Sequence, residues 1–287
     1  MCYHCRPSRR SFTTLLAAGV GMAALAGCTP DTPVASPTAA PSPSGPQTAT
    51  PTPTVATTTP VPATAGSQPP PSGAPPSKAP PSGVLSRQFS LSDPTSQWVI
   101  VNKHRPLAPL QFVPADLVQP RLQLAVSGEA SLLNSTTAGA AEKLFAAAAS
   151  AGATMTLASG YRSFQTQTAT YNGYVNTRGQ ASADTASARP GFSEHQTGWA
   201  FDIGDGGGAC SFEPCFTDQP SAVWAKANAH KYGFVVRYPW MLHEITGYYY
   251  EPWHLRFIGV EAATDMANRG IATLEEYFGL EAAPGYL

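Results

Sequence analysis

Hydrophobic and polar positions are distributed unevenly along this chain. Residues 29–85 are almost wholly Pro, Thr, Ala, Ser and Gly. Such a segment cannot bury a core, so we expect a disordered or polyproline-II-like linker. From residue 86 onward, apolar residues recur at spacings typical of helices and strands. We therefore expect a single folded domain over residues 86–287, which is an ordinary size for one hydrophobic core.

The folded segment alternates helical and strand patterns without a repeating βαβ order. Mixed elements of this kind favour an α+β fold, with a small antiparallel sheet flanked by helices. The apolar patterns predict strands over 98–101, 154–158, 199–203, 234–237 and 248–257, and helices over 138–151, 164–177, 220–232, 261–269 and 274–278.

The first 28 residues have the pattern of an export signal. Arg6, Arg9 and Arg10 form a basic start, and residues 15–26 form an apolar stretch too short to span a bilayer. The stretch ends in Leu-Ala-Gly-Cys, which resembles the lipobox of bacterial lipoproteins. We expect lipidation at Cys28, with a plain secretory signal and an incidental cysteine as the alternative.

Export and anchoring together predict where the domain works. Residues 8–12 (SRRSF) resemble a twin-arginine signal, but Thr13 and Thr14 replace the usual Leu-Lys, so Sec export is the alternative. A lipid-anchored protein would lie on the outer face of the cytoplasmic membrane, within the cell wall. The net charge of −1 gives no basic excess, so we expect no nucleic-acid partner.

The five cysteines fall into two groups. Cys2, Cys5 and Cys28 belong to the signal segment, which leaves Cys210 and Cys215 in the folded domain. In an exported chain, an even remainder at short spacing predicts a disulfide. Zinc thiolate ligands are the alternative, but no second Cys or His pair lies nearby to complete such a site.

Two separated segments carry the residues of a zinc hydrolase. His195, Asp202 and His254 are two imidazoles and a carboxylate, a ligand set that leaves a fourth zinc position for water, and Glu251 is a candidate base. Pro252 cannot donate a ladder hydrogen bond, so we expect this tetrapeptide at a sheet edge or bend. Taken singly, a surface hydrogen-bonding pair or a half-buried turn explains each segment equally well. The other histidines of the domain are expected to face solvent: His104, His230 and His243.

Together, four segments resemble the zinc D-alanyl-D-alanine carboxypeptidases of the VanY type, which share a superfamily with lysostaphin-type peptidases and hedgehog domains. The resemblance covers residues 96–270. It departs locally at Trp199, which is bulkier than expected but is no ligand. The matching segments are Ser159–Ser163 (SGYRS), Ser193–Gly198 (SEHQTG) with Asp202, Gly233–Pro239 (GFVVRYP) and Glu251–His254 (EPWH).

The resemblance implies a role for each site residue. His195, Asp202 and His254 would bind Zn²⁺, and Glu251 would take a proton from the activated water and pass it to the leaving amine. Arg162 would orient the substrate and stabilise the oxyanion, because a guanidinium is permanently charged. Ser193 and Gln167 are expected to contact the peptide terminus, with Trp253 as an apolar wall.

The expected function is trimming of C-terminal D-alanine from peptidoglycan stem peptides by a tethered monomer. An endopeptidase that cuts inside the stem or crossbridge would use the same catalytic residues and differ only in how the pocket closes. A non-catalytic wall-binding lipoprotein is the third interpretation, but it would need neither Glu251 nor Arg162. The sequence leaves open the choice between tetra- and pentapeptides, between D,D- and L,D-bonds, and any part in antibiotic resistance.

Overall fold

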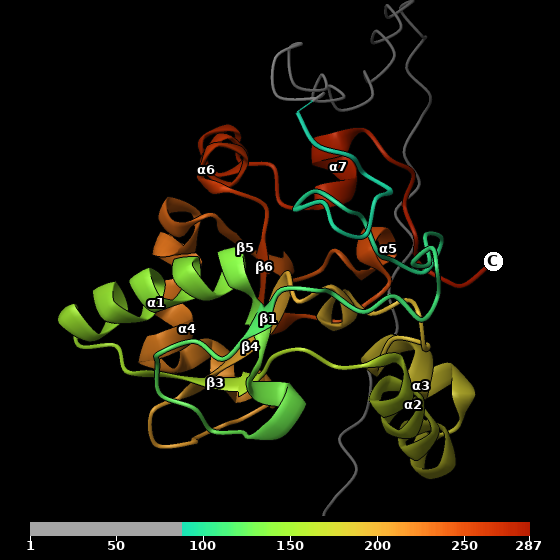
Figure 1. The fold of residues 1–287 in the computed structure, drawn as a ribbon, viewed down its shortest axis with the longest axis horizontal. Helices are drawn as coiled ribbons and strands as arrows, with labels where there is room; N and C mark the ends of the chain where they lie inside the picture. The colour runs from blue at the N-terminus through green and yellow to red at the C-terminus, as the bar shows by residue number, and fades with distance from the viewer. Residues whose placement is uncertain (1–87) are drawn as a thin grey trace, which may run out of the picture. The chain divides into compact units, whose positions relative to one another are not determined.

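The computed structural model describes residues 88–287 (Figure 1). The predicted signal peptide, Cys28 and the linker over residues 29–85 lie outside the described residues. The described part combines helices with two antiparallel sheets, so the predicted α+β class is confirmed. Among its helices, none is both long and apolar enough to cross a membrane.

The elements follow one another with short connections. A 3₁₀ helix, Glu194–Thr197, precedes β4 and carries part of the candidate site. In chain order the strands and α-helices are β1 (Leu117–Val118), β2 (Leu133–Asn134), α1 (Ser135–Ser150), β3 (Met155–Ser159), α2 (Phe164–Arg178), α3 (Gln180–Ala186), β4 (Ala200–Asp205), α4 (Pro220–Asn228), β5 (Phe234–Tyr238), α5 (His243–Thr246), β6 (Glu251–Phe257), α6 (Val260–Arg269) and α7 (Leu274–Phe278).

The larger sheet positions the site. Its strand order is β3-β4-β6-β5, and every neighbouring pair is antiparallel. Asp202 of β4 is paired with Ser159 of β3 on one side and with His254 of β6 on the other. Directly paired residues project from the same face of a sheet, so the strand register alone sets Asp202 beside His254.

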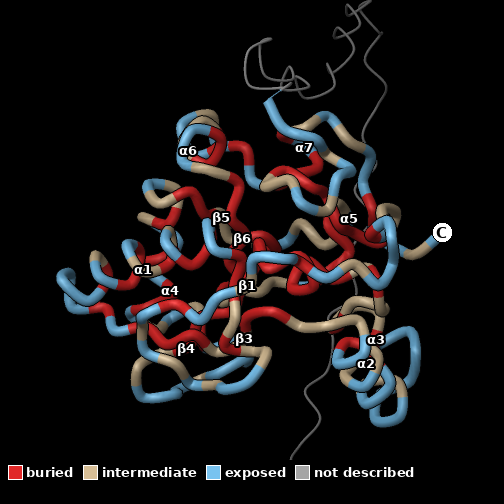
Figure 2. The backbone as a smooth tube through the Cα atoms, viewed as in Figure 1, coloured by how far each residue is buried: buried red, intermediate tan, exposed pale blue. Residues whose placement is uncertain are grey.

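Successive side chains of β4 and β6 point alternately to the hydrophobic core and to the face that carries Asp202 and His254. Phe201 and Leu255 belong to the main hydrophobic core, which α1 and α4 help to form (Figure 1). Their neighbours Asp202 and His254 point to the opposite face, because successive side chains of a strand alternate. Figure 2 shows burial concentrated along the strands, whereas the outer sides of α1 and of the α2–α3 pair are exposed.

A second core lies at α6 and α7. The segment Trp98–Val101, predicted as a strand, is not one: it is buried irregular backbone whose alternate side chains enter the two cores. The Arg256 guanidinium donates to the carbonyl of Val99 at 2.8 Å and to that of Gln97 at 2.9 Å. A side chain therefore supplies hydrogen bonds that a neighbouring strand would otherwise provide.

The predicted helices are confirmed, with shifted ends. The α1 helix begins at Ser135 because the Asn134 side chain accepts hydrogen bonds from the backbone N–H groups of Thr136 and Thr137. The helix predicted over 220–232 is α4 followed by a 3₁₀ turn, Ala229–Tyr232. The α3 helix, directly after Gly179, was not predicted.

The prediction that Pro252 lies at a sheet edge or bend holds locally, because the pairing of β6 with β4 ends at His254 and its pairing with β5 is irregular at this point. The β6 strand is internal to the sheet, between β4 and β5. Leu255 pairs with Val236, and Glu251 pairs with Tyr238. Between these two pairs, β6 has two more residues than β5, so the register shifts. Pro252 lies inside this irregularity, where the regular ladder is interrupted, which is how an internal strand accommodates a residue without an N–H.

Candidate metal centre and catalytic pocket

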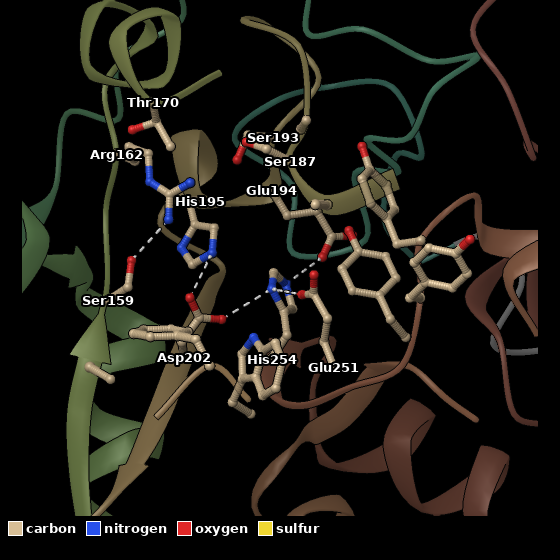
Figure 3. Close-up of a pocket in the computed structure, with 18 of the residues that line it drawn as sticks. Ser159, Arg162, Thr170, Ser187, Ser193, Glu194, His195, Asp202, Glu251 and His254 are labelled. Carbon is tan, nitrogen blue, oxygen red and sulfur yellow. Dashed lines mark hydrogen bonds and ion pairs between the residues drawn. The ribbon is translucent and has the colours of Figure 1, made fainter. Parts of the chain in front are cut away.

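Three elements bring the predicted metal ligands together (Figure 3). His195 lies on the 3₁₀ helix before β4, Asp202 on β4 and His254 on β6. The His195 Nε2 atom is 3.3 Å from Asp202 Oδ2, and the His254 Nδ1 atom is 3.3 Å from Asp202 Oδ1. All three side chains are buried.

Two glycines permit the close approach of the segment that carries His195. Gly198 ends the 3₁₀ helix with φ of +69°, and a Cβ there would lie 2.7 Å from the backbone nitrogen of Asn134. A Cβ on Gly160 would lie 2.5 Å from the carbonyl oxygen of Leu132. The Gly160 carbonyl in turn lies 2.7 Å from His195 Nδ1, so that imidazole donates through Nδ1 and presents Nε2 to Asp202.

The three residues fit a zinc ion. One ligand atom from each lies within 4.8 Å of the others. A tetrahedral zinc shell places neighbouring ligand atoms about 3.3 Å apart. Each imidazole lies at about that distance from Asp202, but the two rings face different oxygens of its carboxylate. Asp202 Oδ1 is buried without a hydrogen-bond partner, although His254 Nδ1 faces it. A cation between these atoms would satisfy both.

The electrostatics of the ligands also suit a cation. Burial alone would raise the pKa of Asp202, but the two adjacent imidazoles hold it well below its usual range. Burial lowers the pKa of His195, with Arg162 adding to the effect and Asp202 opposing it. Burial opposes the charge on His254 as well, but the adjacent carboxylates of Asp202 and Glu194 raise its pKa to about 9, so a metal would compete with a proton there.

Glu251 lies next to the ligands without being one of them. Its Oε2 is 3.6 Å from His254 Nδ1, and its side chain is 18% exposed, toward the pocket. Burial raises its pKa to about 8, with Asp202 adding to the effect and His254 and Arg162 opposing it. A carboxyl group whose pKa lies near neutrality can both accept and donate a proton, as a general base and acid must.

Arg162 reaches the pocket from the loop between β3 and α2. Its Nη2 donates to Ser159 Oγ at 3.1 Å and its Nη1 to Gln167 Oε1 at 3.0 Å. Gln167 is fully buried, and its amide nitrogen donates to Ser187 and to the Ala188 carbonyl. The prediction of direct substrate contact is therefore corrected: Gln167 lies behind Arg162 and orients it.

The remaining predicted residues line one pocket of about 630 Å³. Ser193 lies at its wall, and Trp253 contacts Phe212 edge-on with ring centroids 5.9 Å apart. The predicted disulfide is present between Cys210 and Cys215, and its loop carries Phe212 into the same pocket. This excludes the alternative in which the two thiolates bind zinc.

Sequence reasoning assigned no role to a group of charges behind His254. Glu194, Arg237, Arg256 and Glu275 all have side chains with no solvent exposure. The sequence did contain a sign of these buried charges. One arginine lies within each of the strands β5 and β6, and a buried guanidinium needs a carboxylate partner.

Of the other histidines, His104 and His243 lie beside exposed glutamates at 4.0 Å and 3.4 Å. Among residues 88–287, no second group of His, Cys, Asp or Glu is arranged for metal binding.

The sequence of the domain is similar to named carboxypeptidases. The family model for VanY, D-alanyl-D-alanine carboxypeptidase, matches residues 130–260. YodJ of Bacillus subtilis (strain 168), which bears the name of a carboxypeptidase, is 36% identical over 66% of this chain and 69% of its own length. A D-alanyl-D-alanine carboxypeptidase of Enterococcus faecalis is 38% identical over 49% of this chain and 53% of its own length.

Solved structures agree with the sequence comparisons. The LdcB LD-carboxypeptidase superposes with a TM-score of 0.60 at 37% identity, covering 65% of this chain and 87% of that one. A mutant of the D,D-pentapeptidase VanY in complex with Zn(II) gives a TM-score of 0.51 at 33% identity, covering 62% and 97%. With its buried His-Asp-His group, the chain belongs to the VanY family of D-alanyl-D-alanine carboxypeptidases, which are zinc metallopeptidases.

Proposed function

We propose that this protein removes the C-terminal D-alanine from peptidoglycan stem peptides as a zinc-dependent carboxypeptidase. The observation that carries the proposal is that Glu251 and Arg162 line the same pocket as His195, Asp202 and His254. A protein that only binds a metal or a wall peptide needs neither an acid of raised pKa nor a guanidinium at this place. The family membership and the names of the relatives support the same activity.

The proton chemistry falls to Glu251. A zinc ion held by the three ligands would supply Lewis acidity and lower the pKa of a water molecule from 15.7 to about 7. Glu251 would accept the proton of the attacking water, since its carboxylate lies beside the ligands and faces the pocket. The same carboxyl group, then protonated, would donate to the amine of the leaving D-alanine.

Arg162 would stabilise the charge that develops on the scissile carbonyl oxygen. A guanidinium is a planar hydrogen-bond donor of fixed geometry, and Ser159 and Gln167 hold two nitrogens of this one in place. A donor fixed before the reaction begins needs no reorganisation when the oxyanion forms. Ser193 and Trp253 line the pocket and would contact the bound peptide.

Hydrolysis of an L,D-bond is the second candidate. The LdcB LD-carboxypeptidase and an L,D-carboxypeptidase DacB from Streptococcus pneumoniae resemble this chain at 37% and 39% identity. The same proton chemistry would serve a tetrapeptide that ends in a diamino acid followed by D-alanine. Only the contacts of the residue before the cut would differ.

Mass spectrometry of stem peptides incubated with the zinc-loaded protein tests these proposals. Loss of one alanine from a pentapeptide supports D,D-cleavage, loss of one from a tetrapeptide supports L,D-cleavage, and internal fragments support an endopeptidase. A chelator should abolish the reaction and added Zn²⁺ should restore it. Zinc binding without cleavage of any stem peptide would overturn the enzymatic proposal and favour a wall-binding lipoprotein.

We also propose that the domain acts while tethered outside the cell, as a monomer. The lipobox-like sequence before Cys28 and the Pro/Thr/Ser/Ala-rich residues 29–85 support this location. Metabolic labelling with an acyl-chain analogue tests the anchor. Wild-type protein should incorporate the label, whereas Cys28→Ala should not and should be released from the membrane fraction.

A further inference from the structure

A row of four buried charges lies directly behind the metal centre. The Glu275 carboxylate receives hydrogen bonds from Arg237 at 2.7 and 3.0 Å, and Arg237 Nε donates to Glu194 Oε1 at 2.8 Å. Arg256 Nη1 donates to the same Glu194 oxygen at 3.3 Å. The second oxygen of Glu194 lies 3.2 Å from His254 Nε2. The row therefore ends on a metal ligand.

The contact with Glu194 determines which nitrogen of His254 faces the metal. Glu194 Oε1 accepts hydrogen bonds from two buried guanidinium groups, and its Oε2 is the carboxylate oxygen that faces His254 Nε2. The hydrogen of that contact lies on His254 Nε2, so Nδ1, the atom that faces Asp202, is the nitrogen available to a metal. His195 has the reverse arrangement, because its Nδ1 donates to a backbone carbonyl and its Nε2 faces Asp202.

We propose that Glu194 is a positioning residue of the metal centre, which fixes the tautomer and ring orientation of His254 so that Nδ1 binds the metal. The inference rests on the proposed zinc site. A carboxylate behind a metal-binding imidazole orients the ring and increases its basicity. Here the carboxylate belongs to the residue that directly precedes the other imidazole ligand, so one turn of 3₁₀ helix, Glu194–Thr197, serves both histidines.

The surroundings of Glu194 hold its carboxylate in a single orientation. Arg237 comes from β5 and Arg256 from β6, and Arg256 is itself fixed by the carbonyls of Gln97 and Val99. Burying four charges is a poor way to gain stability, because desolvation offsets most of the attraction. The two arginines that contact Glu194 nevertheless hold its carboxylate as one rigid hydrogen-bond acceptor against His254, whereas Glu275 contacts only the far side of Arg237.

The tautomers can be read in the wild-type protein. Full-length protein labelled with ¹⁵N-histidine and loaded with Zn²⁺ is observed by long-range ¹H–¹⁵N NMR. We expect one zinc-bound histidine with its proton on Nδ1, assigned to His195, and one with its proton on Nε2, assigned to His254. Two zinc-bound histidines that both carry the proton on Nδ1 would overturn the proposal. Absence of any zinc-bound histidine would instead contradict the proposed metal site.

Variants separate positioning from general stability. Glu194→Ala should weaken zinc binding about 10- to 100-fold, measured by competition with a chromogenic chelator, and Glu194→Gln should weaken it less, because an amide oxygen still accepts. Glu275→Gln is the matched control: it removes a charge from the same row without touching either imidazole. It should lower the melting temperature of the metal-free protein but keep wild-type zinc affinity.

Two results would contradict a positioning role. One is wild-type zinc affinity in folded Glu194→Ala. The other is an equal loss of affinity in Glu275→Gln, which would show that the row acts only through overall stability. Circular dichroism of each metal-free variant establishes folding. Should Glu194→Ala not fold, the nearly isosteric Glu194→Gln and the wild-type tautomers decide the question.

Discussion

At the scale of single residues, two carboxyl groups of the pocket lie in opposite electrostatic environments. Asp202 faces two imidazoles, which hold its pKa well below the usual range. Glu251 is partly buried, and the nearby positive charges offset the effect of burial less completely, so its pKa rises to about 8. When the pKa values of two acids in one site differ in this way, one acid stays charged while the other can accept and donate protons. This difference supports the proposed roles, in which Asp202 binds the metal and Glu251 transfers protons.

Glu251→Ala is expected to lower kcat by about 10²- to 10⁴-fold, the usual contribution of a general acid–base group. Zinc content should stay at the wild-type level, because Glu251 is not one of the three candidate ligands. D-Alanine release and metal analysis on the same sample check both expectations. Glu261→Gln, an exposed carboxylate on α6, is the control and should retain full activity. Near-wild-type turnover in Glu251→Ala would remove Glu251 from the mechanism.

At the scale of elements, the start of α1 and the 3₁₀ helix that carries His195 share one residue. Asn134 caps α1 through its side-chain oxygen, and its amide nitrogen donates to the Asp116 carboxylate at 2.9 and 3.0 Å. Its backbone N–H donates to the carbonyl of Gly198, where the 3₁₀ helix ends. One residue thus links a core helix, through its side chain, to the segment that carries His195, through its backbone.

Asn134→Ala should destabilise the domain by about 1–2 kcal/mol, the usual effect of losing a capping side chain. Asn134→Ser is the matched variant, because serine can cap the helix but cannot reach Asp116 as the amide does. We expect the order wild type, Asn134→Ser, Asn134→Ala in the free energy of unfolding, measured with urea. A serine variant no more stable than the alanine variant would assign the effect to Asp116 rather than to the cap.

The limits of sequence reasoning also appear at this scale. The helices α1, α2, α4, α6 and α7 and the strands β3 to β6 were predictable because their apolar spacing is local. Trp98–Val101 was misassigned as a strand because alternation reports an extended, buried backbone, whereas its hydrogen-bond partner is the distant Arg256 side chain. The internal position of β6 could not be predicted from the sequence either. A proline suggests an edge, but here a register shift relative to β5 accommodates Pro252.

For the site, the sequence indicated which residues matter but not where each side chain points. The metal ligands, Glu251 and Arg162 could be proposed from the motifs and meet in one pocket. Gln167 was expected at the substrate, yet it lies behind Arg162. The carboxylate of Glu194 had no assigned role, because its partners come from strands β5 and β6, far along the chain.

At the scale of the whole domain, contacts distant in sequence join its C-terminal segment to Lys103 and to the residues at and just after the α2–α3 pair. Lys103 donates to the carbonyls of Gly247 and Pro284. The Tyr286 hydroxyl accepts from the backbone N–H of Arg189 at 2.8 Å, and the Arg189 guanidinium lies 4.1 Å from the centre of the same ring. The wall of the pocket at α3 is therefore tied to the end of the chain.

A single carboxylate holds Arg189 in this arrangement. Asp184 of α3 forms a two-pronged ion pair with Arg189, at 2.9 and 3.0 Å, and accepts from the Tyr171 hydroxyl at 2.8 Å. Burial raises the pKa of Asp184, but the hydrogen bonds from Arg189 and Tyr171 outweigh burial and lower it overall. Asp184 thus binds protons less readily in the folded than in the unfolded state.

Stability from this cluster should therefore depend on pH. A group whose pKa falls on folding contributes fully above its unfolded value, near 3.8, and loses that contribution as pH falls through the folded value. Asp184→Asn should cost about 1–2 kcal/mol at pH 7. The difference in melting temperature between wild type and Asp184→Asn should be the same at pH 7 and about pH 5. This difference should become smaller toward about pH 3.5. Asp218→Asn, at an exposed aspartate, should change little throughout. A deficit that widens on acidification would contradict the assignment of the lowered pKa to Asp184.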